Sequence, residues 1–326
     1  MKILIIRFSS IGDIVLTSPV IRCLKNQISN SEIHYLTGYP YRDIVAHNPF
    51  IDKKYLLQND FYSVIRDLRK ENYDFILDLH GSRQSWLVKL LLGKRSRTFN
   101  KLNFEKWVLV NFKLNIFPPV HIVERYLEPV RWLGVRNDGG GLNYFIAPED
   151  EITIDQLPLT HIHGYIALVI GARHHTKKLP PDKLRKLCSY LTYPIIVLGG
   201  PEDKPIGEQL AKDDPVKIVN GCGTFSLNQS ASLIKQSQAV ITHDTGLMHI
   251  AAAFNKRIIS IWGNTVPEFG MYPYYGALPV NSLRVGIDGL PCRPCSKIGY
   301  SRCPKGHFRC MMLIEEKSVA EAVSRL

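Results

Sequence analysis

The segment from Phe8 to Asp13 combines small residues with a carboxylate directly after an apolar run. Small residues and Gly12 allow the backbone to turn sharply and to approach a ligand closely. Asp13 can accept a proton from a nucleophile as a general base, or it can cap the helix that follows. Because Pro19 interrupts the following helical pattern, capping alone does not account for Asp13. Both interpretations stay open at this point.

A second polar segment, His243-Asp244-Thr245-Gly246-Leu247, stands between an apolar run and an alanine-rich helical stretch. The free amides and the dipole at the start of a helix form a ready binding site for phosphate. The alanines at 251–253 are explained by close packing of that helix on a sheet.

Two further segments carry groups suited to a nucleotide. Residues 171–180 include Arg173, Thr176, Lys177 and Lys178, which suit a diphosphate, although charge runs also occur on solvated surfaces. Residues 198–203 contain Glu202, which can hold a ribose or lie at a helix start. The chain has no Gly-x-Gly-x-x-Gly and no Walker A motif, which argues against nicotinamide enzymes and P-loop nucleotidases.

Four of the seven cysteines crowd one segment, at Cys292, Cys295, Cys303 and Cys310. The pair Cys292-x2-Cys295 supplies one half of a zinc site, whereas the spacing of the other two departs from the usual pattern. A structural zinc and four reduced thiols both remain open. The odd total argues against a disulfide framework.

These segments need parallel sheets to position them, because each follows a short apolar run and precedes a helical pattern. We expect strands at 3–7, 33–37, 75–79, 165–170, 195–198, 216–219, 239–242 and 258–262. Helical patterns occupy 20–27, 181–191, 205–212, 227–236 and 247–254. The pattern predicts an α/β fold with two Rossmann-like, doubly wound domains, whose ligands bind at the carboxyl ends of the strands.

Length and charge agree with two domains and an anionic partner. The 326 residues suit two units, and the formal net charge of +12 suits nucleic acid, a phosphorylated metabolite or a membrane surface. We expect domains at 1–155 and 156–312, and a terminal helix at 313–326 that starts at the capping box Ser318-x-x-Glu321 and could pack back on the first domain. No apolar run spans a bilayer and the start is no signal peptide, so we expect a cytoplasmic protein.

Taken in order, the motifs resemble glycosyltransferase family 9, the bacterial heptosyltransferases of lipopolysaccharide core assembly. The resemblance rests on Ser9-Ser10-Ile11-Gly12-Asp13, on Lys177-x-Leu179-Pro180 and on Leu198-Gly199-Gly200. It rests further on Asp244-Thr245-Gly246-Leu247-x-His249 and on the cysteine tail. Leu179 replaces a tryptophan of the family and His80 stands where relatives often have glutamine, so the acceptor or the sugar can differ.

The resemblance implies a GT-B fold with an interdomain cleft, an ADP-activated heptose as donor, and an inverting transfer without metal or cofactor. By carry-over, Asp13 is the base and Lys177 is the cation beside the diphosphate. The resemblance implies donor contacts for Thr176, Glu202, Phe225, Asp244, Thr245, Gly246, Leu247 and His249, with Phe225 on the adenine and Glu202 on the ribose. We assign acceptor contacts to Ser10, Gly12, His80 and Arg83.

The implied acceptor is a lipid-linked oligosaccharide of the lipopolysaccharide-core type. Its acidic groups could meet a cationic set that could equally be solubilising: Arg83, Lys89, Lys94, Arg95 and Arg97. We expect a monomer that contacts the inner face of the cytoplasmic membrane peripherally and binds no nucleic acid. Two alternatives stay open: a GT-B-like nucleotide-sugar epimerase or hydrolase, and a basic zinc protein that binds nucleic acid through the cysteine tail.

Overall fold

The computed structural model describes residues 1–325, which divide into two compact units. Unit 1 comprises residues 1–102, 120–145 and 276–278, and unit 2 comprises 103–119, 146–275 and the chain from 279 onward. The chain therefore passes between the units several times, whereas the sequence predicts a single boundary at residue 155. The segment at Asp138 belongs to unit 1, where Arg22 binds its carboxylate at 2.6 and 2.7 Å.

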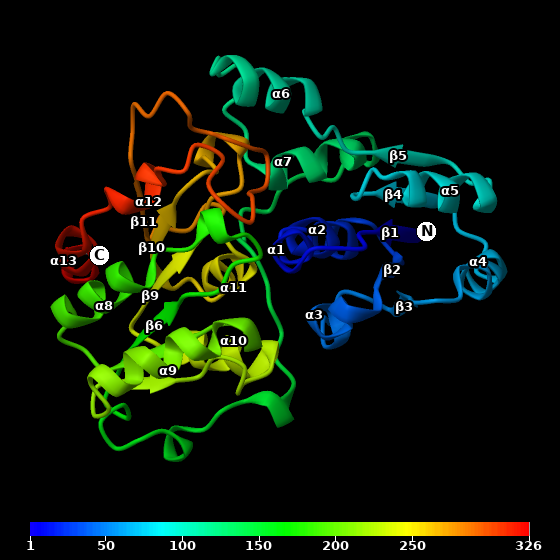
Figure 1. The fold of residues 1–326 in the computed structure, drawn as a ribbon. Coiled ribbons are helices and arrows are strands. Elements are labelled where there is room, and N and C mark those ends of the chain that lie inside the picture. The colour runs from blue at the N-terminus through cyan, green and yellow to red at the C-terminus, as the bar shows by residue number, and fades with distance from the viewer. Residues whose placement is uncertain (326) are drawn as a thin grey trace. The chain divides into compact units, whose positions relative to one another are not determined.

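Unit 1 is built on a five-stranded parallel sheet in the order β3-β2-β1-β4-β5 (Figure 1). Its strands are β1 (Lys2–Ile6), β2 (Glu32–Gly38), β3 (Lys53–Leu57), β4 (Phe75–Asp78) and β5 (Ser96–Thr98). The central strand β1 is apolar and buried from Ile3 to Ile6, as expected for a parallel strand covered on both faces. Because all five strands run in one direction, the loops after β1 and β4 emerge at the same edge.

The helices of unit 1 are α1 (Ile11–Val15), α2 (Ser18–Gln27), α3 (Arg42–Ala46), α4 (Phe61–Lys70), α5 (Arg83–Leu92) and α7 (Ile122–Leu127). Pro19 lies in the first turn of α2, which explains why the helical pattern restarts there. Helix α5 begins where the Ser82 hydroxyl accepts a bond from the Ser85 amide. It ends at Gly93, whose φ of +62° is readily adopted only by glycine.

Unit 2 is built on a six-stranded parallel sheet in the order β11-β10-β9-β6-β7-β8. Its strands are β6 (Ile166–Val169), β7 (Ile195–Leu198), β8 (Ile218–Asn220), β9 (Ala239–His243), β10 (Arg257–Trp262) and β11 (Ser282–Gly286). The central strands β6, β7 and β9 are buried along their whole length. The loops after β6, β7, β8 and β9 therefore meet at one edge.

The helices of unit 2 are α6 (Asn103–Phe112), α8 (Pro181–Tyr190), α9 (Lys204–Asp213), α10 (Leu227–Gln236), α11 (Gly246–Ala253), α12 (Arg309–Met312) and α13 (Glu316–Arg325). The terminal helix α13 packs on α8 and β10 (Figure 1), with Val319 and Val323 in the core of unit 2. The sequence analysis allowed this helix to pack back on the first domain. In the structure it packs on the second unit instead. Ser318 lies inside α13 and is not its N-cap, so the predicted capping box is wrong.

The two predicted parallel sheets are confirmed, and the differences fall at their edges. All eight predicted strands are present within one or two residues, and α10 has its predicted bounds. The strands that the sequence did not predict are β3, β5 and β11, three of the four outer strands of the two sheets, where polar residues interrupt the apolar pattern. In the part of the chain that the structure describes, no helix is long and apolar enough to cross a membrane.

Candidate active site

Asp13 lies at the carboxyl edge of the unit 1 sheet, in the first turn of α1, where two neighbours hold its carboxylate. Arg7 donates from Nη2 to Oδ1 at 2.7 Å, and the Ser10 hydroxyl donates to Oδ2 at 2.8 Å. The Ser10 amide adds a 3.3 Å bond, so Asp13 also serves the helix start. The Asp13 side chain is 21% exposed, which leaves it accessible to a substrate hydroxyl.

The electrostatic surroundings keep Asp13 ionised. Burial alone would raise its pKa, but the charge of Arg7 and the hydrogen bonds from Ser10 outweigh burial and lower the pKa below its ordinary value of 3.8. Asp13 is therefore a carboxylate throughout the neutral range, ready to accept a proton.

Arg7 connects the two strand exits beside Asp13 and was missed by the sequence interpretation. Its guanidinium donates to the Ser9 carbonyl at 2.7 Å and to the Leu79 carbonyl at 2.5 Å, and it lies 5.8 Å from the centre of the Tyr126 ring. The available signal was a charged residue at the end of an otherwise apolar strand, which the pattern counted as a strand boundary. Arg7 is a positioning residue for Asp13.

His80 follows β4 at the same edge, with its ring against Phe8 at a centroid distance of 5.0 Å. Burial, together with the charges of Arg7 and Lys101, lowers the pKa of His80 to about 4, so the imidazole is neutral at pH 7. Its Nδ1 is buried without a hydrogen-bond partner among the described residues. Because this nitrogen is buried, a sugar hydroxyl does not reach it in this structure, and the acceptor contact of His80 stays a prediction.

Asp78, at the end of β4, organises the loop that carries His80 and engages one of the cations predicted to bind the acceptor. Its buried carboxylate accepts from the amides of His80 and Gly81 and pairs with Lys89 at 2.9 Å. Lys89 is therefore used inside unit 1, and its predicted acceptor contact is not supported by this geometry. Arg83 is exposed at the start of α5, and its acceptor contact stays a prediction.

In unit 2, Lys177 and Asp244 join the loops that follow β6 and β9. Lys177 Nζ lies 2.6 Å from Asp244 Oδ2 and 3.3 Å from the Asp244 carbonyl, and Thr265 donates to the same Oδ2 at 2.8 Å. An ammonium has three N–H donors. Two point to Asp244, so the third can reach an anionic ligand.

The adjacent Lys178 connects the β6 loop to the loop after β7. Its ammonium pairs at 2.5 Å with the buried Asp203, whose other oxygen accepts from the Gly200 amide at 3.0 Å. Gly199 is required here, because a Cβ would lie 2.8 Å from the Asp203 carboxylate. Two consecutive lysines thus fix three strand exits. The sequence analysis counted Lys178 among the cations suited to a diphosphate and did not predict its pair with Asp203.

Helix α11 begins at this edge, with Thr245 as its extended N-cap residue and Gly246 as its first helical residue. The Thr245 hydroxyl lies 3.4 Å from that of Thr242. The first amides of α11, at Gly246 and Leu247, have no carbonyl within the helix to bind, and they suit a phosphate. Met248 and His249 are buried on the side that packs into the unit. The structure therefore brings Lys177 together with Asp244, Thr245 and Gly246, as the motif implied.

The residues predicted to bind the nucleoside lie on the loops after β7 and β8. The Gly223 amide donates to the Gly199 carbonyl at 3.1 Å, which joins the two loops. Glu202 is exposed, and the half-buried Phe225 ring rests on Gly221, where a Cβ would lie 2.9 Å from it. The structure thus brings the loops of Glu202 and Phe225 together, while their ligand contacts stay predictions.

Thr176 supports the cysteine segment. Its hydroxyl donates to the Tyr300 carbonyl at 3.2 Å and accepts from the Tyr300 amide at 2.8 Å. Because both bonds hold the hydroxyl, a donor contact through that group would require them to open. The contact predicted for Thr176 therefore remains a prediction.

The four cysteines of the tail are free thiols, of which Cys310 is the most buried. Cys292 Sγ lies 3.8 Å from His307 Nε2, and burial raises the pKa of Cys295 to about 11. Within residues 1–325 no three of these thiols lie within 4.8 Å of one another, as tetrahedral zinc would require. The alternative of zinc on Cys292, Cys295, Cys303 and Cys310 remains a prediction that metal analysis can test.

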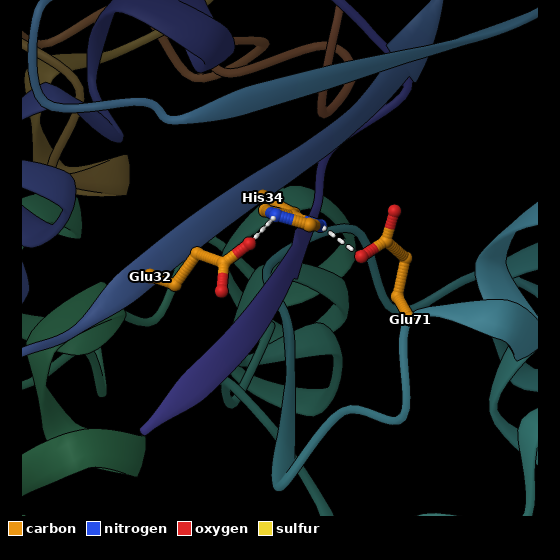
Figure 2. A group of neighbouring side chains, drawn as sticks. All are labelled: Glu32, His34 and Glu71. Carbon is orange, nitrogen blue, oxygen red and sulfur yellow. Dashed lines mark hydrogen bonds and ion pairs between the residues drawn. The ribbon is translucent and has the colours of Figure 1, made fainter.

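A cluster of Glu32, His34 and Glu71 at the amino end of the unit 1 sheet has the residue types of a metal site (Figure 2). Cations of the protein already neutralise it. Lys2 lies 2.8 Å from Glu71 and 3.2 Å from Glu32, and Lys53 lies 2.5 Å from Glu71. A metal ion would have to displace both ammonium groups, so the cluster is an ion-pair network that ties the starts of β1, β2 and β3.

Two parallel α/β units, with phosphate-suited loops at the carboxyl edge of the unit 2 sheet, have the architecture of the GT-B fold class. The sequence profile of glycosyltransferase family 9 (heptosyltransferase) matches residues 61–300. The chain belongs to this family. The family resemblance, the enzyme class and the fold class expected from the sequence are thereby confirmed.

Curated relatives and solved structures that are similar to this chain are also members of the family or heptosyltransferases. A lipopolysaccharide heptosyltransferase 1 from Campylobacter coli is 25% identical, with 100% of this chain and 99% of the relative covered. A glycosyl transferase of family 9 from Veillonella parvula has a TM-score of 0.78 at 18% identity, covering 99% of this chain and 96% of that one. The structure of E. coli ADP-heptose lps heptosyltransferase II has a TM-score of 0.75 at 19% identity, and the alignment covers 100% of this chain and 98% of that one. The similarity to solved structures supports the fold.

Replacing Glu71 tests the ion-pair network. Bonds from Lys2, Lys53 and Tyr55 lower the pKa of Glu71 below its ordinary value. E71Q should lower the free energy of unfolding by about 1–2 kcal/mol at pH 7, measured by urea denaturation. Because the folded-state pKa is depressed, the deficit is fully present above about pH 4.3, the pKa of an unfolded glutamate, and shrinks at lower pH.

The exposed Glu128 provides the matched control, and E128Q should leave stability unchanged. A chelator should not shift the unfolding midpoint of the wild-type protein. A large shift on chelation in the wild-type protein that is absent in E71Q would instead favour a metal at this cluster.

Proposed function

We propose that the protein transfers a heptose from ADP-heptose to an acceptor of the lipopolysaccharide-core type, with inversion and without a metal. The observation that carries the proposal is the ionised, partly exposed Asp13 that Arg7 holds at a strand exit of unit 1. Relatives named lipopolysaccharide heptosyltransferases and E. coli structures with ADP and ADP-2-deoxy-2-fluoro heptose support the donor and acceptor class.

The donor diphosphate is assigned to unit 2. Negative charge grows on the departing ADP as the bond from C1 to the phosphate oxygen breaks, so stabilising groups must be in place beforehand. The third N–H of Lys177 and the free amides at the start of α11 supply them. Lys178 holds the neighbouring loop through Asp203 and does not need to touch the donor.

The acceptor hydroxyl is assigned to unit 1. Its oxygen attacks C1 from the face opposite to ADP, so the new C–O bond forms as ADP leaves with the bonding electrons. The hydroxyl becomes strongly acidic as that bond forms, so a carboxylate of low pKa is a sufficient base. The proton passes to Asp13 and then to solvent, while the neutral His80 binds a neighbouring hydroxyl.

The proposed setting follows from the acceptor. A lipid-linked oligosaccharide is reached at the inner face of the cytoplasmic membrane, so we propose that the protein acts there as a peripheral monomer. Nucleic acid is not a proposed partner, because the basic charge is explained by an anionic acceptor and surface.

Replacing the base separates chemistry from binding. D13N should lower turnover of ADP-heptose in the presence of acceptor by about a hundredfold or more, because no group then accepts the proton. ADP affinity, measured by calorimetry, should stay within about twofold, since Asp13 belongs to the acceptor side. The control D43N changes an exposed carboxylate of unit 1 and should leave turnover intact. Full activity of D13N would refute the role of Asp13.

Replacing Lys177, the cation assigned to the donor, should instead weaken donor binding. K177A should weaken ADP binding by about ten- to a hundredfold, the value of a charge-assisted hydrogen bond to phosphate. K177R, which keeps a charge, should recover part of that loss. K212A on α9 is the matched control, because Lys212 is exposed and lies outside the assigned site. Unchanged ADP affinity in a folded K177A protein would remove Lys177 from the donor site.

A further inference from the structure

Helix α5 of unit 1 has two apolar faces, of which only one is covered within the unit. Val88 and Leu92 face inward and join the core cluster that includes Leu68 of α4. On the outer side Trp86 is 59% exposed and Leu90 is 58% exposed, and Leu87 beside them is 37% exposed.

The exposed residues form one continuous stripe. Trp86, Leu87 and Leu90 follow Arg83 at spacings of three, four and seven residues, so all four share one face of the helix. The exposed Lys94 follows Gly93, at which α5 ends. Single exposed apolar residues are ordinary, whereas an apolar stripe between two cations is the pattern of a helix that lies on a membrane surface.

The charge around the stripe has one sign. Residues 79–104 contain six lysines and arginines and no aspartate or glutamate. Lys89 is engaged by the buried Asp78, so it belongs to the interior. The exposed cations Arg83, Lys94, Arg95 and Arg97 form no ion pair with any residue that the structure describes.

Aromatic surface continues beside the edge strand β5. The guanidinium groups of Arg95 and Arg97 lie 4.1 and 5.2 Å from the centre of the Trp132 ring, which is 37% exposed. Arginines on an outer strand also prevent pairing with other strands. That role explains Arg95 and Arg97 alone, but it does not explain the uncovered Trp86 and Leu90.

We propose that the α5 surface, made of Trp86, Leu87 and Leu90 with Arg83, Lys94, Arg95 and Arg97, docks on an anionic phospholipid bilayer. The apolar stripe enters the boundary between headgroups and acyl chains, and the unpaired cations bind lipid phosphates. An anionic bilayer matches both features, since it offers apolar depth beneath a negatively charged surface. The inference rests on the proposed function, in which the acceptor is lipid-linked, and it names the surface that brings unit 1 to that acceptor.

The test is co-sedimentation of the full chain with vesicles of phosphatidylcholine and phosphatidylglycerol, against vesicles of phosphatidylcholine alone. The wild-type protein should bind the anionic vesicles and be released by high salt. W86S/L90S should lower the partition coefficient about tenfold or more, because the inserted apolar groups are lost. R83Q/K94Q should lower it by about 25-fold, since each cation near an anionic surface contributes about fivefold.

Matched controls locate the effect. L159S changes a leucine that is 81% exposed in unit 2, and K212Q changes an exposed cation of α9, so neither should alter vesicle binding. W107S/F112S removes two of the three exposed aromatic residues of α6, and binding lost in that variant but kept in W86S/L90S would overturn the proposal. A concentration-dependent dimer that W86S/L90S abolishes, without vesicle binding by the wild type, would also overturn it and assign the stripe to a second copy.

ADP binding distinguishes this inference from the proposed function. W86S/L90S and R83Q/K94Q should bind ADP like the wild-type protein, because their changes lie outside the donor loops. Absent vesicle binding with intact ADP binding contradicts the α5 surface alone. Vesicle binding without any ADP binding contradicts the transferase instead.

Discussion

The ion pair between Arg7 and Asp13 is the interaction on which the rest of the site in unit 1 depends. A carboxylate near the end of a buried strand needs a partner, because an unpaired buried charge costs several kcal/mol. Arg7 meets that need and at the same time binds the carbonyls of Ser9 and Leu79. One guanidinium thus fixes the ionisation of Asp13, its position, and the loop that carries His80.

Unit 2 uses the same principle with two lysines. Lys177 and Lys178 are neighbours in sequence, yet one pairs with Asp244 after β9 and the other with Asp203 beyond β7. Each ion pair joins loops from separate strands, so the edge of the sheet is organised before a ligand arrives. Preorganised charge is what leaving-group stabilisation requires, because no rearrangement is then needed during reaction.

The sequence predicts the parts of this protein whose signals are local. Central strands such as β6 and β7 are continuous apolar runs, and the start of α11 has a recognisable turn, so both were predicted correctly. Three of the four edge strands were missed because exposed, polar strands such as β5 lack that signal. The role of Arg7 and the pairs Lys178–Asp203 and Lys89–Asp78 were missed because they depend on which strand exits become neighbours. The return of 103–119 to unit 2 depends on the same kind of long-range contact.

The dependence of turnover on pH in Arg7 variants tests the central claim most directly. The account predicts that kcat/KM of the wild-type protein keeps its acidic limb below pH 3.8, since Arg7 lowers the pKa of Asp13. In R7Q the charge that lowers the pKa of Asp13 is lost, while burial still raises that pKa, so the acidic limb of kcat/KM should move to higher pH. R7K should move the acidic limb back to lower pH, because an ammonium restores the positive charge. Coincident acidic limbs in the wild-type protein and R7Q, with both proteins folded, would contradict the claim that Arg7 keeps Asp13 ionised for catalysis.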